Sequence, residues 1–244
     1  MPNNDIKHAI ELIHGAGYIT ALTGAGISTL SGLADFRGEK NPIWDRYPQE
    51  KVFDRDYFRE DPELFYDFLR EITQKNYEPN IAHLALKKME ETGKLKAVIT
   101  QNIDGLHQKA GSKKVHELHG SIYNNHCEEC DKEFLFHDFL IKIKAETVPK
   151  CSCGGVIRPG IVFFGEPLPE EDSQLSIYNA SKSDLMIVAG TSLIVQPAAY
   201  MPMYTLKNGG KIILVNKGST YIDERADFIF EDIGEFFGEL EQSL

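Results

Sequence analysis

The chain has 244 residues, of which 42% are hydrophobic and 26% charged, and its formal net charge is −11. This composition is typical of a folded globular protein, and the length suits one large domain or one domain with a small insertion. The negative charge argues against the phosphate backbone of DNA as the main ligand.

The first third of the chain begins with a predicted amphipathic helix at 6–13, whose charged residues interrupt any signal-peptide core. No apolar run is long enough to span a membrane, so we expect a cytoplasmic protein that does not bind membranes. Residues 18–24 read as a buried strand that enters a glycine turn at 24–28. Residues 39–80 are rich in aromatic residues, charge and proline, and include a helix that begins near Pro62.

Apolar strands alternate with helices in the rest of the chain. This alternation predicts a parallel sheet with helices on both faces. The expected helices are 80–93, 170–183 and 197–207, and the expected strands are 96–102, 160–166, 184–192, 211–218 and 226–232.

Four predicted strands end in a glycine or polar turn, and such ends line the ligand crevice of a doubly wound sheet. The turn "GAGIS" offers backbone N–H groups to phosphate oxygens, although Thr29 stands where the third glycine of the dinucleotide fingerprint would be. Read alone, this turn is as compatible with a tight turn that binds nothing. "GTS" at 190–192 offers a second cradle and Asn216 can bond ribose hydroxyls, so a dinucleotide is the simplest shared ligand.

All four cysteines fall in one segment, as "CEEC" and "CSC". Two thiolate pairs about twenty residues apart favour a closed structural zinc site over free, redox-active or disulfide-bonded cysteines. His126 adjoins the first pair, but four sulfurs suffice, and a surface role fits this histidine better. The expected ligands are Cys127, Cys130, Cys151 and Cys153.

These motifs occur in the order seen in one family. "GAGIS", "DFRG", "TQNIDGLH", "HG", the cysteine pairs, "FGE" and "GTSL" together make the chain similar to sirtuins, which are NAD-dependent protein lysine deacylases. Two departures are Ala34, where proline is usual, and the tighter second cysteine pair. The tyrosine and arginine pattern of succinyl-lysine sirtuins is absent, so acidic acyl groups are not the favoured substrates.

The resemblance implies an α/β fold in which 1–244 form a single catalytic domain. A Rossmann-like parallel sheet domain would carry an inserted small zinc-binding module and a helical insertion. The expected bounds are about 1–38, 81–120 and 158–244 for the core, 39–80 for the helical insertion and 121–157 for the zinc module.

The resemblance also implies the reaction. The protein would remove acetyl groups from lysine side chains of proteins or peptides, with other short or apolar acyl groups as further candidates. NAD would be consumed, giving nicotinamide, O-acetyl-ADP-ribose and free lysine, and one zinc ion would be structural.

Among the site residues that the resemblance implies, His119 is the general base, and its ordinary pKa of about 6.5 suits this role near neutral pH. Asn102 is the second catalytic residue and, with Gln101, would hold the ribose or an ordered water. Asp104 would bond the nicotinamide amide. The cofactor residues are Gly24, Ala25, Gly26, Thr29, Asp35, Phe36, Arg37, Gln101, Asn102, Ile103, Asp104, His119, Gly190, Thr191, Ser192, Asn216 and Ile233.

The substrate would add as an extended strand beside two segments, "VFFGE" and "LIVQPAA". An apolar tunnel would accept the neutral acyl-lysine and disfavour the charged free lysine. An ordinary core role is an alternative reading for these residues, above all for Val195. The substrate residues are Val162, Phe164, Gly165, Glu166 and Val195.

Two other histidines, His107 and His116, read better as packing or structural residues. Two further functions stay open at this point. One is a mono-ADP-ribosyltransferase at the same site, and the other is a zinc module without enzymatic activity.

Overall fold

The central sheet of the computed structural model consists of parallel strands only, within the described residues 4–35 and 42–244. The strand order is β3 (Val115–Glu117), β2 (Leu95–Thr100), β1 (Ile19–Thr23), β7 (Leu185–Ala189), β8 (Lys211–Val215) and β9 (Phe228–Phe230). This is the Rossmann order, which reverses between its first and fourth strands. The ligand crevice of such a sheet therefore lies at the carboxyl ends of β1 and β7, and the predicted parallel sheet is confirmed.

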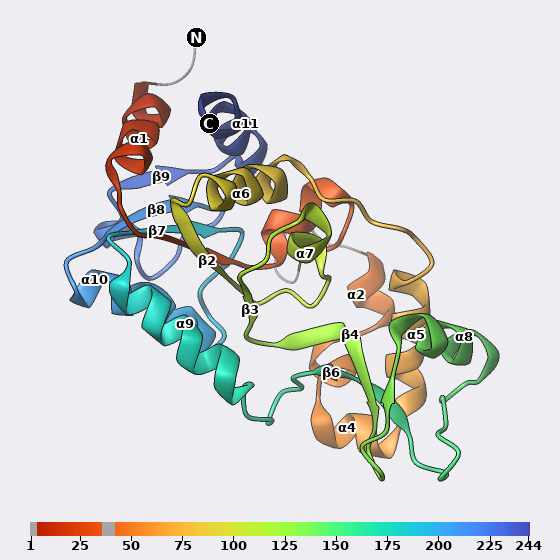
Figure 1. The fold of residues 1–244 in the computed structure, drawn as a ribbon. Coiled ribbons are helices and arrows are strands. Elements are labelled where there is room, and N and C mark those ends of the chain that lie inside the picture. The colour runs from red at the N-terminus through yellow and green to blue at the C-terminus, as the bar shows by residue number, and fades with distance from the viewer. Residues whose placement is uncertain (1–3, 36–41) are drawn as a thin grey trace.

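Helices cover both faces of this sheet (Figure 1). Strand β7 is apolar throughout because alternate residues face opposite helical layers: Ile187 joins one core cluster, while Met186 and Val188 join the other. One face carries α1 (Asn4–Gly15), α6 (Ile81–Glu91) and α11 (Ile233–Ser243), and the other carries α9 (Glu170–Lys182) and α10 (Met201–Lys207).

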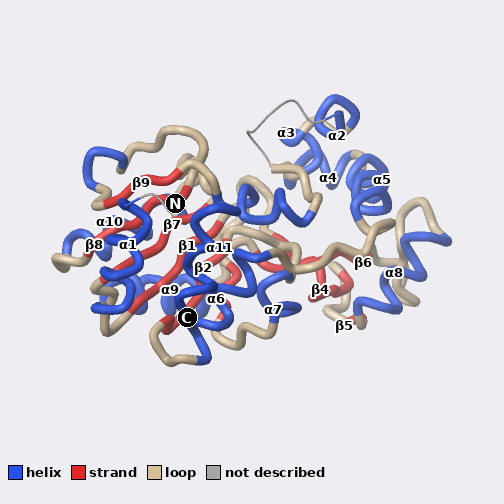
Figure 2. The backbone as a smooth tube through the Cα atoms, turned by 90° about the horizontal axis from the view of Figure 1, so that it is seen from above, coloured by secondary structure: helices blue, strands red, loops and turns tan. Residues whose placement is uncertain are grey.

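A second, smaller part of the molecule lies beside the large sheet (Figure 2). Its antiparallel sheet has the order β5 (Glu133–Phe134), β4 (Gly120–Cys127) and β6 (Ile157–Ile161). The helices packed with this sheet are α2 (Pro42–Arg46), α3 (Gln49–Val52), α4 (Arg55–Glu60), α5 (Pro62–Ile72) and α8 (Phe136–Ala145).

The small part has one continuous apolar core. Phe58 and Tyr66 from the helices pack in the same cluster as Cys127, Phe139 and Ile157 from the cysteine-bearing segment. The two insertions expected from the sequence therefore stabilise each other rather than packing separately.

The strand expected at 160–166 is wrong in both position and sheet. Strand β6 ends at Ile161 and pairs with β4 in the small sheet. The following residues stay apolar because the Phe163 ring, 1% exposed, packs 5.0 Å from the Phe58 ring in the small core. Phe164 makes only an isolated parallel bridge, to Asp54.

The remaining elements are short helices at turns. The expected glycine turn continues into the 3-10 helix η1 (Ala25–Ser31), and the helix expected at 197–207 is divided between η2 (Ala198–Tyr200) and α10. The other two are α7 (Leu106–Ala110) and η3 (Asp223–Arg225). Within the part of the chain that the structure describes, no helix has the length and apolar character needed to cross a membrane.

Candidate active site

The turns after β1 and β7 are in direct backbone contact. Gly24 N donates to Ala189 O at 3.1 Å, and Gly26 N donates to Gly190 O at 2.8 Å. A Cβ on Gly24 would lie 2.8 Å from Gly190 O, and one on Gly190, whose φ is +63°, would lie 2.2 Å from Ile27 N. Glycine is needed here because two backbones meet, which is a different reason from the ligand approach inferred from the sequence.

The loop after β2 is hydrogen-bonded to the end of β1 and to the turn after β7. Gln101 N donates to Thr23 O at 2.9 Å, and Gln101 Nε2 donates to Thr191 Oγ1 at 2.9 Å. Gly190 N in turn donates to Val215 O, which brings the end of β8 alongside. The structure therefore brings together the four polar strand ends that the sequence singled out.

Ser28 links the two polar residues of this loop. Asn102 Nδ2 donates to Ser28 Oγ at 3.1 Å, and Ser28 Oγ donates to Asp104 Oδ2 at 2.7 Å. Ser28 is 1% exposed, so this bridge is shielded from water. We did not single out Ser28 from the sequence. Its position two residues after the second glycine of the strand-end turn was the available signal.

Asp104 is held on both carboxylate oxygens. Oδ1 accepts from Leu106 N at 2.9 Å, and Oδ2 accepts from Ser28. Burial raises the pKa of Asp104, and the two hydrogen bonds oppose this shift because they stabilise the charged form. The oriented carboxyl group can accept hydrogen bonds from an amide ligand such as nicotinamide.

His119 has the geometry of a general base. Its Nδ1 lies 3.0 Å from Gln101 O. A carbonyl oxygen can only accept, so Nδ1 carries the proton and Nε2 keeps its lone pair. Burial lowers the pKa of His119, with the Gln101 hydrogen bond opposing the shift, so the ring is neutral near pH 7.

The other two histidines of this stretch lie apart from His119. His107 is 1% exposed, and its Nε2 lies 3.0 Å from Thr23 Oγ1 beneath the loop. His116, on the edge strand β3, contacts Asn179 of α9 through Nε2 and lies 3.5 Å from an Asp172 carboxylate oxygen. Both positions agree with the structural roles expected from the sequence.

Three other predicted cofactor residues lie near the strand ends, and each has a different structural setting. Asn216 follows β8 and donates through Nδ2 to Gly218 O at 2.7 Å. Thr29 Oγ1 donates to Gly26 O, so this exposed side chain stabilises the turn. Ile233 begins α11, close to η1, since a Cβ on Gly234 would lie 3.5 Å from Leu30 Cδ1. Phe36 and Arg37 lie outside the described residues.

The substrate residues expected after β6 connect the two parts of the molecule. Val162 N donates to His119 O at 2.9 Å, and Phe164 N donates to Phe53 O at 2.7 Å. The Phe164 side chain is 47% exposed, as a surface that receives a peptide requires. Val195 lies in the second predicted segment, 193–199, and is half-buried.

Glu166 has a structural partner. Both of its carboxylate oxygens accept from the Arg158 guanidinium at 2.9 Å, and Oε2 also accepts from Phe163 N. These hydrogen bonds lower the pKa of Glu166, against the effect of burial. Arg158 also lies over the Phe163 ring, so this charged pair shapes the turn that presents Phe164.

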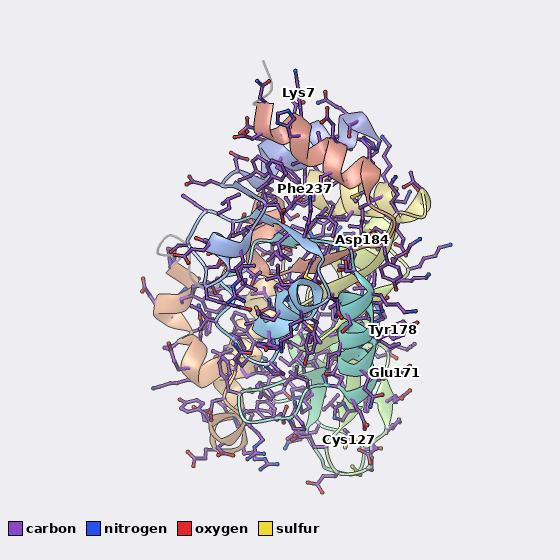
Figure 3. All side chains as sticks on the ribbon, turned by 90° about the vertical axis from the view of Figure 1, so that its left-hand side faces the viewer. Lys7, Cys127, Glu171, Tyr178, Asp184 and Phe237 are labelled. Atoms are coloured by element: carbon purple, nitrogen blue, oxygen red, sulfur yellow. The ribbon has the colours of Figure 1, made fainter. Side chains whose placement is uncertain are left out.

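The four cysteines converge at the far end of the molecule from α1, where Figure 3 shows Cys127 opposite Lys7. Their sulfurs all lie within 4.8 Å of one another, with separations of 3.4 Å for Cys127–Cys153 and 3.8 Å for Cys130–Cys151. A tetrahedron with Zn–S bonds of about 2.3 Å has edges of about 3.8 Å. The cluster therefore fits one zinc ion and is too open for disulfides.

Comparison with known proteins finds relatives of one family over most of the chain. The model of the Sir2 family matches residues 24–197. A Thermotoga maritima protein named NAD-dependent protein deacetylase is 46% identical over 235 residues, which are 95% of each chain. A protein of the same name from Oceanobacillus iheyensis is 41% identical over 93% of this chain and 95% of the other.

Solved structures of sirtuins are similar to this chain in both sequence and fold. A structure of Sir2Tm bound to a propionylated peptide has a TM-score of 0.88, is 43% identical and covers 98% of both chains. A structure of Sir2 with a p53 peptide and NAD⁺ also has a TM-score of 0.88 at 43% identity, with coverage of 97% of this chain and 96% of the other.

Proposed function

The chain belongs to the Sir2 family, and on this premise we propose that it is an NAD-dependent protein lysine deacetylase. The substrates are acetyl-lysine side chains of proteins or peptides, and the products are nicotinamide, O-acetyl-ADP-ribose and free lysine. One observation carries the proposal: His119 bonds to Gln101 O through Nδ1, which leaves Nε2 unprotonated, at the crevice of a Rossmann-like sheet.

The residues at the crevice divide the work of the reaction. The phosphates of NAD lie against the turns at Gly24–Gly26 and Gly190–Ser192, although the N–H groups of the three glycines already bond to backbone oxygens, and Asn216 binds the ribose. Asp104 orients the nicotinamide amide, so that the acyl-lysine oxygen attacks the ribose carbon from the opposite face as nicotinamide leaves. His119 Nε2 then takes the proton from a ribose hydroxyl, which attacks the acyl carbon, and one water adds to the same carbon as its bond to the lysine nitrogen breaks, releasing free lysine.

The peptide lies along the segment that contains Phe164, and a second segment near Val195 forms the facing edge. Its acyl-lysine enters between apolar side chains, where a neutral acyl group is accepted and a free ammonium group is not. Propionyl and similar short apolar groups fit this chemistry as well as acetyl, in line with the propionylated peptide in the Sir2Tm structure.

The cysteine cluster holds one structural zinc ion, since four sulfur ligands leave no open position for chemistry. The site works in the cytoplasm, without DNA or a membrane as partner. The domain bounds given from the sequence stay a proposal, in which residues 121–157 form the zinc module and residues 39–80 the helical insertion.

The test is product analysis with NAD and an acetylated peptide. Mass spectrometry should show O-acetyl-ADP-ribose and deacetylated peptide in equal amounts, and nicotinamide should appear only when the acetylated peptide is present. The same peptide without the acetyl group is the control. ADP-ribosylated protein with an unchanged peptide would instead identify a mono-ADP-ribosyltransferase, and no turnover of NAD would leave a binding module.

A further inference from the structure

Two buried histidines beneath the active site have complementary nitrogens without partners. His83 is 0% exposed and His107 is 1% exposed, and their ring centroids are 4.8 Å apart. Among the described residues, none offers a hydrogen bond to His83 Nε2 or to His107 Nδ1. Buried polar atoms in folded proteins nearly always have a partner, so this pair of atoms needs an explanation.

The protonation of His83 follows from the start of α6. Asn80 caps this helix by accepting from Ala82 N, and Asn80 N donates to His83 Nδ1 at 3.3 Å. A nitrogen that accepts a hydrogen bond carries no proton, so the proton of the neutral ring is on Nε2. Burial lowers the pKa of His83 to about 4, which keeps the ring neutral near pH 7. His83 Nε2 is therefore a donor.

The protonation of His107 follows from its other neighbour. The Thr23 hydroxyl donates to Thr100 Oγ1 at 2.9 Å, so Thr23 Oγ1 accepts from His107 Nε2 at 3.0 Å. This leaves His107 Nδ1 as an acceptor. The reverse arrangement would put a proton on Nδ1 and set two donors against each other between the histidine rings.

We propose that His83 and His107 are positioning residues for Asn102, through a buried hydrogen-bond chain whose donors run from His83 to Thr100, the residue that also accepts from the Asn102 peptide. His83 Nε2–H donates to one buried water, which donates to His107 Nδ1, and His107 Nε2–H donates to Thr23 Oγ1. Thr23 donates to Thr100 Oγ1, which also accepts the peptide N–H of Asn102 at 3.0 Å. The importance of this chain rests on the proposed function, in which Asn102 is a catalytic residue.

A chain of this kind fixes the active-site loop because its members cannot exchange partners with water. Thr23 is 0% exposed and Thr100 is 2% exposed. Asn80 extends the chain to the nucleotide turn, since its Nδ2 donates to Ile27 O at 2.8 Å. The start of α6, the turn after β1 and the loop after β2 are thus held in one arrangement, and a fully satisfied buried network specifies a single geometry.

The decisive pair of variants lies on one strand. Thr23→Val removes the central hydroxyl and keeps the side-chain shape. Thr20→Val makes the same change at a residue of β1 that is also 0% exposed but whose hydroxyl donates to Ser183. We expect Thr23→Val to lower kcat by about tenfold with little change in KM, because small misplacement of a reacting group is costly. Thr20→Val should keep kcat, and Thr23→Ser should restore it.

NMR measurements test the chain without any activity. Nitrogen-15 shifts should show both His83 and His107 protonated at Nε2, and the Asn102 amide resonance should move in Thr23→Val but not in Thr20→Val. A proton on His107 Nδ1, or equal losses of kcat in the two valine variants, would overturn the proposal. If the wild-type protein deacetylates no peptide, the proposed function fails, while these NMR readouts still decide whether the chain exists.

Discussion

The Nδ1 atom of His119 lies 3.0 Å from the main-chain oxygen of Gln101, the first residue after the second strand of the large sheet. This one hydrogen bond sets the ring tautomer and leaves the lone pair of Nε2 free. The base is therefore oriented by backbone, which no side-chain substitution at position 101 removes.

Replacement of His119 by alanine should lower turnover by about 10² to 10⁴, the range for a positioned general base. NAD binding should persist, and labelled nicotinamide should still exchange into NAD, because the base acts after nicotinamide leaves. His116→Ala is the control, since this histidine contacts Asn179 on the outer face of the edge strand. A folded His116 variant as inactive as the His119 variant would show that the base had been assigned wrongly.

Ser28→Ala should lower kcat/KM by about 5- to 150-fold, because the loss of a buried hydrogen-bond partner costs about 1–3 kcal/mol. The variant leaves both Asn102 Nδ2 and Asp104 Oδ2 without the hydroxyl between them. Ser176→Ala is a matched control, since Ser176 is 0% exposed and its hydroxyl has no partner among the described residues. If steady-state kinetics show similar losses of kcat/KM in the Ser28→Ala and Ser176→Ala variants, Ser28 has no specific role.

The free energy of unfolding should fall as the pH is lowered from 6.5 to 4. Burial lowers the pKa of His83 to about 4, so below pH 6.5 the unfolded chain takes up a proton that the folded chain does not. The loss from this residue alone approaches about 3 kcal/mol once the pH reaches 4. His107 acts in the same direction, while burial raises the pKa of Asp104 and so opposes it.

Denaturant unfolding at several pH values measures this slope. His83→Gln, which cannot take up a proton, should lose less stability than the wild type over the same interval. An equal loss in both proteins would mean that His83 is not the residue responsible.

Metal analysis should find one zinc ion per chain. A structural zinc site shares its free energy with folding, so removing the ion should unfold the small part, whose apolar core includes Cys127 and Cys151. Cys127→Ser should lose both zinc and the near-ultraviolet signal of the aromatic cluster. Ser152→Ala, between two of the ligands, should keep both. Less than about half an equivalent of zinc in the wild type would contradict the assignment.

The sequence predicted those features that depend on local pattern. Alternating apolar strands and helices were enough to predict a covered parallel sheet, and the four polar strand ends predicted which side of it holds the site. The cysteine spacing predicted the cluster at Cys127 and Cys153, because metal ligands are chemically distinctive wherever they occur.

Features that depend on contacts distant in the chain were missed. The run at 160–166 is apolar because Phe163 packs on Phe58, about a hundred residues earlier, and no local pattern separates this from strand burial. The sequence marked Gly190 as part of a possible ligand cradle but did not show that a side chain there would meet the backbone of Ile27. The sequence did not single out Ser28, since only the fold brings it between Asn102 and Asp104.

The chain crosses from the large sheet to the small one at Leu118 and His119. Leu118 N still bonds to Thr100 O in the first sheet, while His119 O already accepts from Val162 beside the second. The residue that would act as the base is therefore also the joint between the two parts. For protein engineering, this means that the small part cannot be exchanged between relatives at Leu118–His119 without effect, because a splice there would change the orientation of the imidazole. Splice sites that leave His119 in place have to lie within both β4 and β6.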